Sequence, residues 1–466
     1  MHRDGHTPEV TIEEYTQDIL GRHAVTGPRY RRALWVFGLL FLAGVVGFIW
    51  RALVDGFDER EPWGYFAATV AFLLTTAGAA PLVAVTMRMV KAHWRRPMAR
   101  IAELYSVVGV LTLLMFIPLL FLVPSAENRN TLWIQGDKVP NPVQIPGAPH
   151  AYVLLALALL VLSGLALLWL STRPDRAILR ARKAAVATMT GEASAPTSWL
   201  GTRKQWKVMQ AGLGLVGGFF FLILVGAISL FCIDFAMALV PGWRDAIFPT
   251  FQSLNALQAG LAMVLLSLWF LRRYGGLERY IHMEHFWGAS KILLALTLLW
   301  FYFWWSGFIV FWYGRQPVER SLLQLLMFGP YRYVFFLAFA LCFVAPFLTL
   351  LWNGVRKSTW GPPLASAFIL TGTLFDKVRL YVAAYSVEGK HIAEHALTAE
   401  MIRPTNWPDL VDVMMVVGGI SGGIFLLLLA ARVVPIMSLW EMAEGIRLRA
   451  VRPFLRTTVT VLGKPE

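Results

Sequence analysis

Residues 208–233 read VMQAGLGLVGGFFFLILVGAISLFCI, a run of 26 residues without Asp, Glu, Lys or Arg. An α-helix needs about 20 apolar residues to cross ~30 Å of hydrocarbon, so this run predicts a transmembrane helix. The chain contains nine more uncharged stretches of at least 18 residues: 33–50, 63–87, 104–123, 151–172, 246–271, 292–314, 333–355, 358–375 and 413–431. Their continuous apolar character favours helices over the alternating strands of a membrane β-barrel.

The composition indicates the same class of protein. Of the 466 residues, 57% are hydrophobic and 15% are charged, whereas an average soluble protein has about 25% charged residues. A soluble chain of this length needs a polar surface around two or three domains, and these charges are too few to make it. The sequence therefore predicts an all-α polytopic membrane protein with about ten transmembrane helices.

The Lys and Arg residues predict the orientation. If the N-terminus is cytoplasmic, 30 of the 42 Lys and Arg residues fall in cytoplasmic segments, as the positive-inside rule requires. We therefore expect both termini in the cytoplasm. The net charge of +14 then reflects these segments and their contact with anionic lipids, and it gives no reason to expect nucleic acid as a partner.

The metal-ligating residues are few. Cys232 and Cys342 lie in apolar runs, far apart in the sequence, and an iron–sulfur cluster needs about four Cys. A haem between membrane helices needs axial ligands inside the bundle, yet none of the nine His lies near the middle of a predicted span. We expect no haem, no iron–sulfur cluster and no other metal site in this chain.

Ionisable side chains near the hydrocarbon cost about 2.5–3.5 kcal/mol each to insert, so each of them is a candidate functional residue. On the predicted outer side the candidates are Tyr65, His150, Asp234, Arg315, Glu319, Asp376, Lys377 and Arg379. On the predicted inner side they are Glu103, Tyr105, Glu284, His285 and Lys291.

Several of these residues have a simpler interpretation. Tyr65 fits an interfacial aromatic belt, and Arg88 and Lys291 fit side chains that extend to the lipid headgroups. Asp376, Lys377 and Arg379 fit a surface ion-pair cluster. Asp234 is different, because it follows 26 uncharged residues and precedes another apolar stretch, so we expect it inside the bundle.

Proline and glycine residues interrupt several predicted spans. Pro81, Pro118 and Pro346 lie inside spans and predict kinks. The pairs Gly214-xxx-Gly218 and Gly418-xxx-Gly422 predict close approach between helices.

Several short motifs occur in an order that resembles a known family. They are FCIDFAMALVPGW at 231–243, FWYGRQPVE at 311–319, and GPY at 329–331 followed by Cys342 and Pro346. Together they resemble the polysulfide-reductase membrane-subunit (NrfD-like) family, most closely its ten-span members in bacterial alternative complex III. The resemblance implies two four-helix bundles, spans two to five and six to nine, flanked by spans one and ten.

The resemblance also divides the chain into four parts. Residues 1–32 are a cytoplasmic N-terminal tail, and residues 33–205 are a first half with spans one to four and a basic cytoplasmic loop. Residues 206–385 are a second half with spans five to nine and the NrfD-like core. Residues 386–466 hold an outer loop, span ten and a cytoplasmic C-terminal tail.

The family implies a subunit of a quinol oxidoreductase complex in the bacterial cytoplasmic membrane. Such a subunit binds a quinone, here menaquinone, non-covalently near the outer face and conducts protons. The implied partners are lipids, a ferredoxin-like iron–sulfur subunit on the outer face, a similar ten-span paralogue, and multihaem or other redox subunits.

The resemblance suggests a role for each candidate residue. Asp234, Asp376, His150 and Tyr65 would accept protons from the quinol. Arg315, Glu319, Lys377 and Arg379 would balance charge or contact the partner subunit. Glu103, Tyr105, Glu284, His285 and Lys291 would form an inner proton relay.

One departure from the family leaves alternatives open. Quinone-binding members often carry a His and an Arg just after the Pro near the end of span three, whereas residues 116–122 here read FIPLLFL. The chain is therefore either a quinol-binding subunit with a rebuilt site or the non-catalytic paralogue that supports one. A secondary transporter and a purely structural membrane anchor are the alternatives from other classes.

Overall fold

The computed structural model describes residues 10–24, 27–122, 150–190, 199–387, 397–454 and 457–463. Almost all of this part of the chain is helical, as the sequence predicts for an all-α polytopic membrane protein. Within these residues, nine helical stretches are long and apolar enough to span a membrane.

The remaining predicted span, 358–375, is part of α16 (Gly361–Ser386), which has 26 residues. The helix continues past the predicted boundary. It carries Asp376, Lys377 and Arg379 within its length, rather than in a loop after its end. Those charges reduce the mean hydropathy of α16, although the helix lies between α3 and α10.

The first bundle contains predicted spans two to five. Span two consists of η1 (Glu61–Trp63), α3 (Gly64–Thr76) and α4 (Pro81–Met89). Span three consists of η2 (His93–Arg95), α5 (Arg96–Leu104), α6 (Ser106–Phe116) and α7 (Leu119–Leu122). Spans four and five are α8 (His150–Thr190) and α9 (Arg203–Phe235). Helix α8 packs along α6 and α9, and α4 packs against α5 and α9.

The second bundle contains predicted spans six to nine. The turn η4 (Met237–Leu239) leads to span six, α10 (Ile247–Tyr274), and span seven is α11 (Met283–Gly314). The short helix α12 (Pro317–Leu323) and the π-helical turn η5 (Gln324–Phe328) connect it to span eight. Span eight consists of α13 (Arg332–Phe339), the π-helical turn η6 (Ala340–Val344) and α14 (Ala345–Leu351), and α15 (Asn353–Arg356) leads from it to span nine, α16. Helix α10 contacts both α11 and α16, and it also joins the two bundles through α9 and α3.

The first and last predicted spans flank these bundles. They are α2 (Pro28–Val54) and α17 (Leu410–Val433), which pack along each other, and α17 also contacts α3 and α6. The Gly418-xxx-Gly422 pair lies in this contact, since a Cβ atom on Gly418 would meet Gly44 and one on Gly422 would meet Phe41. By contrast, a Cβ atom on Gly214 or Gly218 would meet no atom within 4 Å, so the first glycine pair has no neighbour here.

The prolines interrupt the spans as predicted. Pro81 begins α4 after a break at residues 77–80, Pro118 lies between α6 and α7, and Pro346 lies in the first turn of α14 just after η6. Proline has no backbone N–H and cannot continue the hydrogen-bond ladder of the preceding turn, which explains each interruption.

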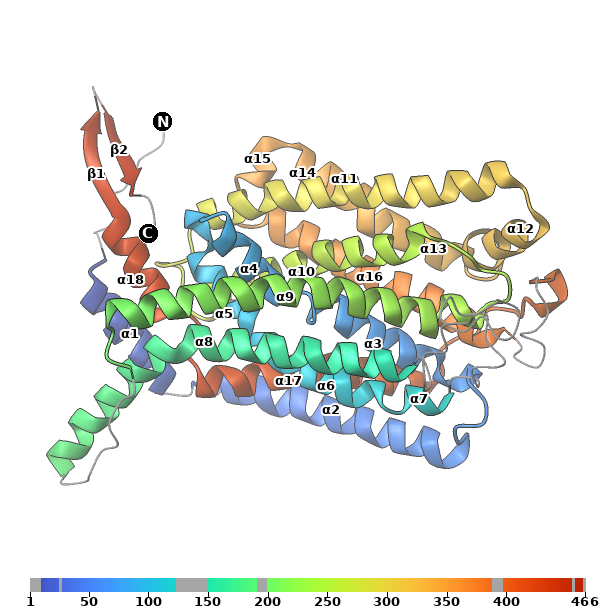
Figure 1. The fold of residues 1–466 in the computed structure, drawn as a ribbon, viewed down its shortest axis with the longest axis horizontal. Helices are drawn as coiled ribbons and strands as arrows, with labels where there is room; N and C mark the ends of the chain where they lie inside the picture. The colour runs from blue at the N-terminus through green and yellow to red at the C-terminus, as the bar shows by residue number, and fades with distance from the viewer. Residues whose placement is uncertain are drawn as a thin grey trace, which may run out of the picture.

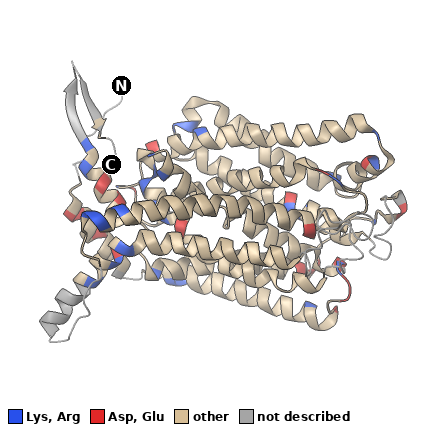
Figure 2. Cartoon of the chain, viewed as in Figure 1, with Lys and Arg blue, Asp and Glu red and all other residues tan. Residues whose placement is uncertain are grey.

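The short terminal elements lie at one end of the bundle (Figure 1). We call this the α18 end, because it holds α1 (Ile12–Ala24) and α18 (Leu439–Leu448), and we call the opposite end the α12 end. The hydroxyl of Tyr15 in α1 donates to the carbonyl of Ser438 at 3.2 Å. An antiparallel hairpin that the sequence did not predict, β1 (Arg449–Phe454) and β2 (Thr457–Leu462), follows α18. Charged residues gather at the two ends, and the helices between them are almost free of charge (Figure 2).

The close approach of α2 and α17 predicts a steric effect on stability. A Cβ atom on Gly44 would lie 2.5 Å from Cα of Gly418, so Gly44→Ala should reduce the free energy of unfolding by about 1–3 kcal/mol through overpacking. Denaturant unfolding of the purified protein in detergent measures the change. The control is Gly226→Ala in α9, where the added Cβ meets no atom within 4 Å. Equal denaturant midpoints for Gly44→Ala and Gly226→Ala would contradict the close packing of α2 against α17.

Candidate functional site

A charged cluster lies inside the second bundle on α16. Asp376 and Lys377 are each 1% exposed, and Arg379 is 3% exposed. Helix α16 runs from the α18 end toward the α12 end (Figure 1). Asp376 lies 15 residues after Gly361, or about 22 Å along the helix, and so in the half nearer the α12 end.

Each member of this cluster has a polar partner. Arg379 Nη2 donates to Asp376 Oδ1 at 2.6 Å, and Arg379 Nη1 donates to the carbonyl of Leu326 in η5 at 3.0 Å. Lys377 Nζ donates to Oε1 of Gln252 in α10. The interpretation of Asp376, Lys377 and Arg379 as a surface ion-pair cluster is therefore wrong. Buried ions of this kind need partners, because the loss of hydration costs several kcal/mol per ion.

A cavity of about 60 Å³ lies beside this cluster. Arg379 forms part of its wall, and Asp245 and Trp243 contribute from the segment between α9 and α10. Aromatic side chains of α10 and α11 form one wall, and aliphatic side chains of α12 and η5 form another. The cavity therefore combines an aromatic lining with a cation and a carboxyl group.

Helix α10 continues the polar surface away from this cluster. Gln252, Asn255 and Gln258 lie three residues apart on one face and are 2%, 0% and 0% exposed. Gln258 Nε2 donates to Thr297 Oγ1 at 3.0 Å and to the carbonyl of Cys342 at 3.1 Å. We call these three amide residues the α10 ladder. Apolar residues follow, and the next polar contact on α10 is the 2.6 Å hydrogen bond between Ser267 Oγ and the Tyr105 hydroxyl.

A second buried network lies at the α18 end. Arg88 pairs with Glu103 of α5 and with Glu441 of α18. Arg100, which is 0% exposed, donates to Asp175 Oδ2 of α8 at 2.6 Å and lies 3.8 Å from Glu103 Oε2. We call these five residues the α18 network, because they connect α18 to the first bundle. Arg88 therefore does not extend to the headgroups, as its position at the end of a predicted span suggested, but pairs inside the protein.

The predicted inner relay residues do not form one group. Glu103 belongs to the α18 network, and Tyr105 bonds to Ser267. His285 is buried, with Nδ1 2.9 Å from the carbonyl of Trp94. Glu284 and Lys291 are exposed on α11, where Lys291 Nζ lies 3.7 Å from the ring centre of Trp287.

The remaining predicted outer residues fall into two environments. Asp234 is fully buried at the end of α9, next to an aromatic cluster in which Phe116 packs against Phe231 and Phe235 at centroid distances of 5.8 and 4.9 Å. The Tyr65 hydroxyl donates to the carbonyl of Asn406 at 2.8 Å.

His150, Arg315 and Glu319 lie nearer the surface. His150 is half-buried at the start of α8. Arg315 is exposed after the end of α11, with a left-handed φ of 52°. Glu319 caps α12 by accepting a hydrogen bond from the backbone N–H of Gln316 at 3.1 Å.

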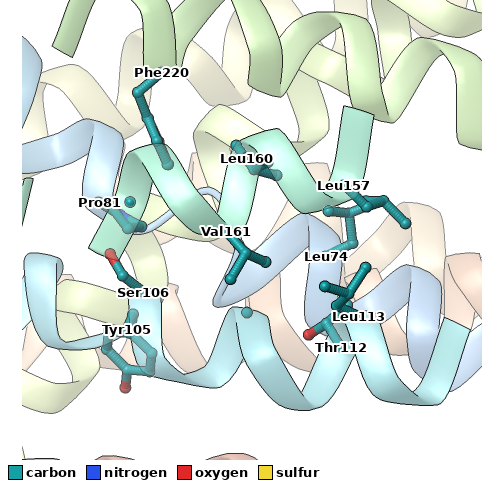
Figure 3. A pocket seen from close by; sticks show the side chains of 13 residues that line it. Leu74, Pro81, Tyr105, Ser106, Thr112, Leu113, Leu157, Leu160, Val161 and Phe220 are labelled. Atoms are coloured by element: carbon teal, nitrogen blue, oxygen red, sulfur yellow. The ribbon is translucent and has the colours of Figure 1, made fainter. Parts of the chain in front are cut away.

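The first bundle contains a smaller cavity of about 20 Å³ (Figure 3). Tyr105, Ser106 and Thr112 of span three face Leu157, Leu160 and Val161 of α8 around it. The Ser106 hydroxyl has no hydrogen-bond partner among the described residues. A cavity of this size holds about one water molecule, and a single hydroxyl gives that water few partners.

Several buried polar residues are not evident from the distribution of charges in the sequence. Gln252, Asn255 and Gln258 lie within an uncharged run, because amides carry no charge, although their spacing of three residues signals one helix face. Arg100 and Asp175 lie beyond the ends of uncharged runs and so fall in predicted loops. Among the residues that the structure describes, no three His, Cys, Asp or Glu side chains come together as a metal site.

A comparison with protein families finds one match. The sequence profile described as "Polysulphide reductase, NrfD" matches residues 54–388, which is more than two thirds of the chain. The match covers both four-helix bundles and the cluster on α16. A search of curated proteins finds no match to the chain.

The α18 network predicts a specific loss of stability. Burial raises the pKa of Glu441, but Arg88 and Arg95 lower it more, so the pKa of this carboxyl lies below its usual value. Glu441→Gln leaves Arg88 short of one buried carboxylate and should cost about 3–5 kcal/mol of unfolding free energy. Thermal unfolding in detergent, with limited proteolysis of the C-terminal segment, measures the effect.

The sign of the pH dependence follows from the lowered pKa. Glu441 stabilises the fold above its unfolded pKa of about 4.3, and that contribution is lost as the pH falls through the folded value. The difference between wild type and Glu441→Gln should therefore shrink below about pH 4. Glu444→Gln on the same helix is the control, because Glu444 is 25% exposed and lies 3.3 Å or more from its partners. An equal loss of stability in Glu441→Gln and Glu444→Gln would show that the burial of Glu441 does not determine its contribution to stability.

Proposed function

The chain belongs to the polysulphide reductase NrfD family of membrane subunits of quinone-linked redox complexes, and we propose that it takes part in quinol oxidation at the α12 end. In this proposal the α12 end faces outward, and both termini lie on the cytoplasmic side of a bacterial cytoplasmic membrane. The excess of Lys and Arg in the segments of the α18 end supports that orientation.

The observation that carries the proposal is the buried cluster on α16. A quinol that gives up two electrons must also give up two protons, and each proton needs an acceptor close to the head group. Asp376 is a carboxylate at suitable depth, and its Oδ2 atom has no hydrogen-bond partner among the described residues. Arg379 Nη2 donates to the other oxygen, Oδ1, at 2.6 Å, which holds the carboxylate in place and leaves Oδ2 to take the proton.

The electrons require a partner protein. In the proposal the two electrons pass to the cluster of a ferredoxin-like iron–sulfur subunit that docks on the α12 end. Arg315 is exposed there, and Glu319 lies nearby on α12. A similar ten-span subunit and multihaem or other redox subunits would complete the complex, and menaquinone is the quinone we expect.

The α10 ladder suggests a route for the released protons. Lys377 connects the α16 cluster to Gln252, and Asn255 and Gln258 continue the polar surface by about 9 Å along the helix. The apolar turns before Ser267 separate the ladder from Tyr105. In this proposal the ladder lines the path of the protons from the α12 end to about the middle of the membrane, and water molecules carry the protons along the ladder and beyond it.

A supporting, non-catalytic paralogue is the second candidate function. The observation that favours it is the aromatic packing of Phe116, Phe231 and Phe235 next to Asp234. The side chains that fill this region are apolar at the point where quinone-binding relatives often carry a His and an Arg. A transporter is less well supported, because the break between α3 and α4 consists of Ala and Gly residues that offer no polar side chain to a substrate.

Substitution of Asp376 tests the proposal. Asp376→Asn removes the proton acceptor and should reduce quinol oxidation by the purified complex at least tenfold, because a positioned acid–base group contributes about 10²–10⁴-fold. The double variant Asp376→Asn/Arg379→Gln removes both members of the ion pair, so Arg379 is not left buried without its carboxylate, and assembly of this variant separates loss of function from loss of folding. Arg273→Gln is the surface control, because Arg273 is exposed in the last turn of α10, away from the α12 end. Wild-type turnover in the Asp376→Asn complex would favour the supporting paralogue.

Interruption of the α10 ladder should reduce proton movement more than it reduces quinol oxidation. Gln258→Leu removes the hydrogen bonds to Thr297 and Cys342. Proton movement by the complex in liposomes, followed with a pH-sensitive dye, should fall several-fold while quinol oxidation is retained. Thr349→Val is the control, since this hydroxyl bonds only locally, to the carbonyl of Ala345. Equal proton movement in the Gln258→Leu and Thr349→Val liposomes would show that the ladder is not part of the proton route.

A further inference from the structure

We propose that the aromatic cavity beside Arg379 is a binding site for the ring of an isoprenoid quinone, with Trp243, Trp304 and Arg379 as hydrogen-bond donors to the ring oxygens. This inference rests on the proposed function and locates it in the second bundle. The site is distinct from the region around Asp234 in the first bundle, where aromatic side chains occupy the interior.

Unpaired donors carry the inference. Trp243 Nε1, Trp304 Nε1 and Arg379 Nε are all buried without a hydrogen-bond partner among the described residues, and all three residues line this cavity. A buried donor without a partner destabilises the fold, and three around one cavity are unusual. A ligand with acceptor oxygens removes that cost, and a quinone ring has two carbonyl oxygens.

The remaining walls suit a planar ring. Phe248 and Phe251 of α10 and Trp304 and Phe308 of α11 all line the cavity. The rings of Trp304 and Phe308 are stacked at 5.4 Å with an interplanar angle of 8°. Stacking between aromatic rings is favourable beyond the burial of their surfaces, so a flat conjugated ring suits these aromatic walls.

Asp245 adds a carboxyl group to the same cavity. Its Oδ1 atom accepts hydrogen bonds from the backbone N–H groups of Ile247 and Phe248 at 2.8 and 3.1 Å, which orients the side chain at the start of α10. Burial raises the pKa of Asp245, although these two hydrogen bonds lower it in part. The group therefore accepts a proton more readily than an exposed carboxylate, as the reduced form of the ligand requires.

The size of the cavity shows how a ring enters. Its volume of about 60 Å³ is below the ~150 Å³ that accommodates benzene in a protein core. Trp304 and Phe308 are only half-buried on α11, next to exposed Trp305. These two side chains must move outward, toward the lipid, to admit the ring. Gly307 lies between them in the lining, and a Cβ atom there would meet no atom within 4 Å.

The test uses a photoreactive short-chain naphthoquinone as the probe and the purified complex as the target. Crosslinks mapped by mass spectrometry should fall on α11 or on the segment from Trp243 to Phe251. Gly307→Leu fills the cavity from a position with free space and should reduce this labelling at least tenfold. The matched control is Gly226→Leu in α9, another half-buried helical glycine with no atom within 4 Å of the added Cβ.

A second variant keeps the test valid if Gly307→Leu fails to assemble. Trp243→Phe retains the ring and removes the N–H donor, which should weaken probe binding about tenfold. Crosslinks that fall only near Asp234, or labelling that persists in both variants, would rule out this cavity as the quinone site. Quinol oxidation by the wild-type complex would then still support the proposed function. A complex that neither oxidises quinol nor takes up the probe would overturn both.

Discussion

The absence of water in the hydrocarbon determines most of this structure. Each buried ion must find its partner within the protein, since the loss of hydration costs several kcal/mol. The described residues meet this requirement where Arg51 of α2 pairs with Asp412 of α17 at 2.8 Å. They also meet it through the α16 cluster near the α12 end and the α18 network at the other end. Between them the α10 ladder uses neutral amides, which need partners but carry no charge. The polar groups thus lie where two or more helices meet, and the two bundles are joined along α10 and α16.

The fold follows from the sequence because length and apolar character identify membrane helices directly. Span nine shows the limit of that reasoning. A charge-free run ends at Phe375, yet α16 continues to Ser386, because Asp376, Lys377 and Arg379 find partners inside the second bundle. Partners that come from other helices, such as Leu326 and Gln252, leave no trace in the local sequence.

The candidate site could be predicted only in part. Asp376 and Arg379 stand out in the sequence as charges at a span end, and the structure places them together. Trp243 and Trp304 do not stand out, because tryptophan near a membrane surface normally belongs to the interfacial belt. Only the packing around each indole shows whether its N–H reaches a partner. The inner relay residues illustrate the same limit, since the rotation of each helix, which neighbouring helices determine, leaves Glu284 exposed and Glu103 buried.

The α18 network also has a consequence for the synthesis of this protein. Arg88 and Glu103 belong to the first bundle, whereas Glu441 follows Arg88 by 353 residues. Arg88 therefore waits for its second carboxylate until both bundles, α17 and the start of α18 have been synthesised. Until then, the first bundle keeps an incompletely neutralised arginine at its α18 end, which must remain in contact with water or headgroups. The α18 end of the membrane domain thus closes only once α18 has been made, and a chain that stops before α18 lacks the residue that closes this end.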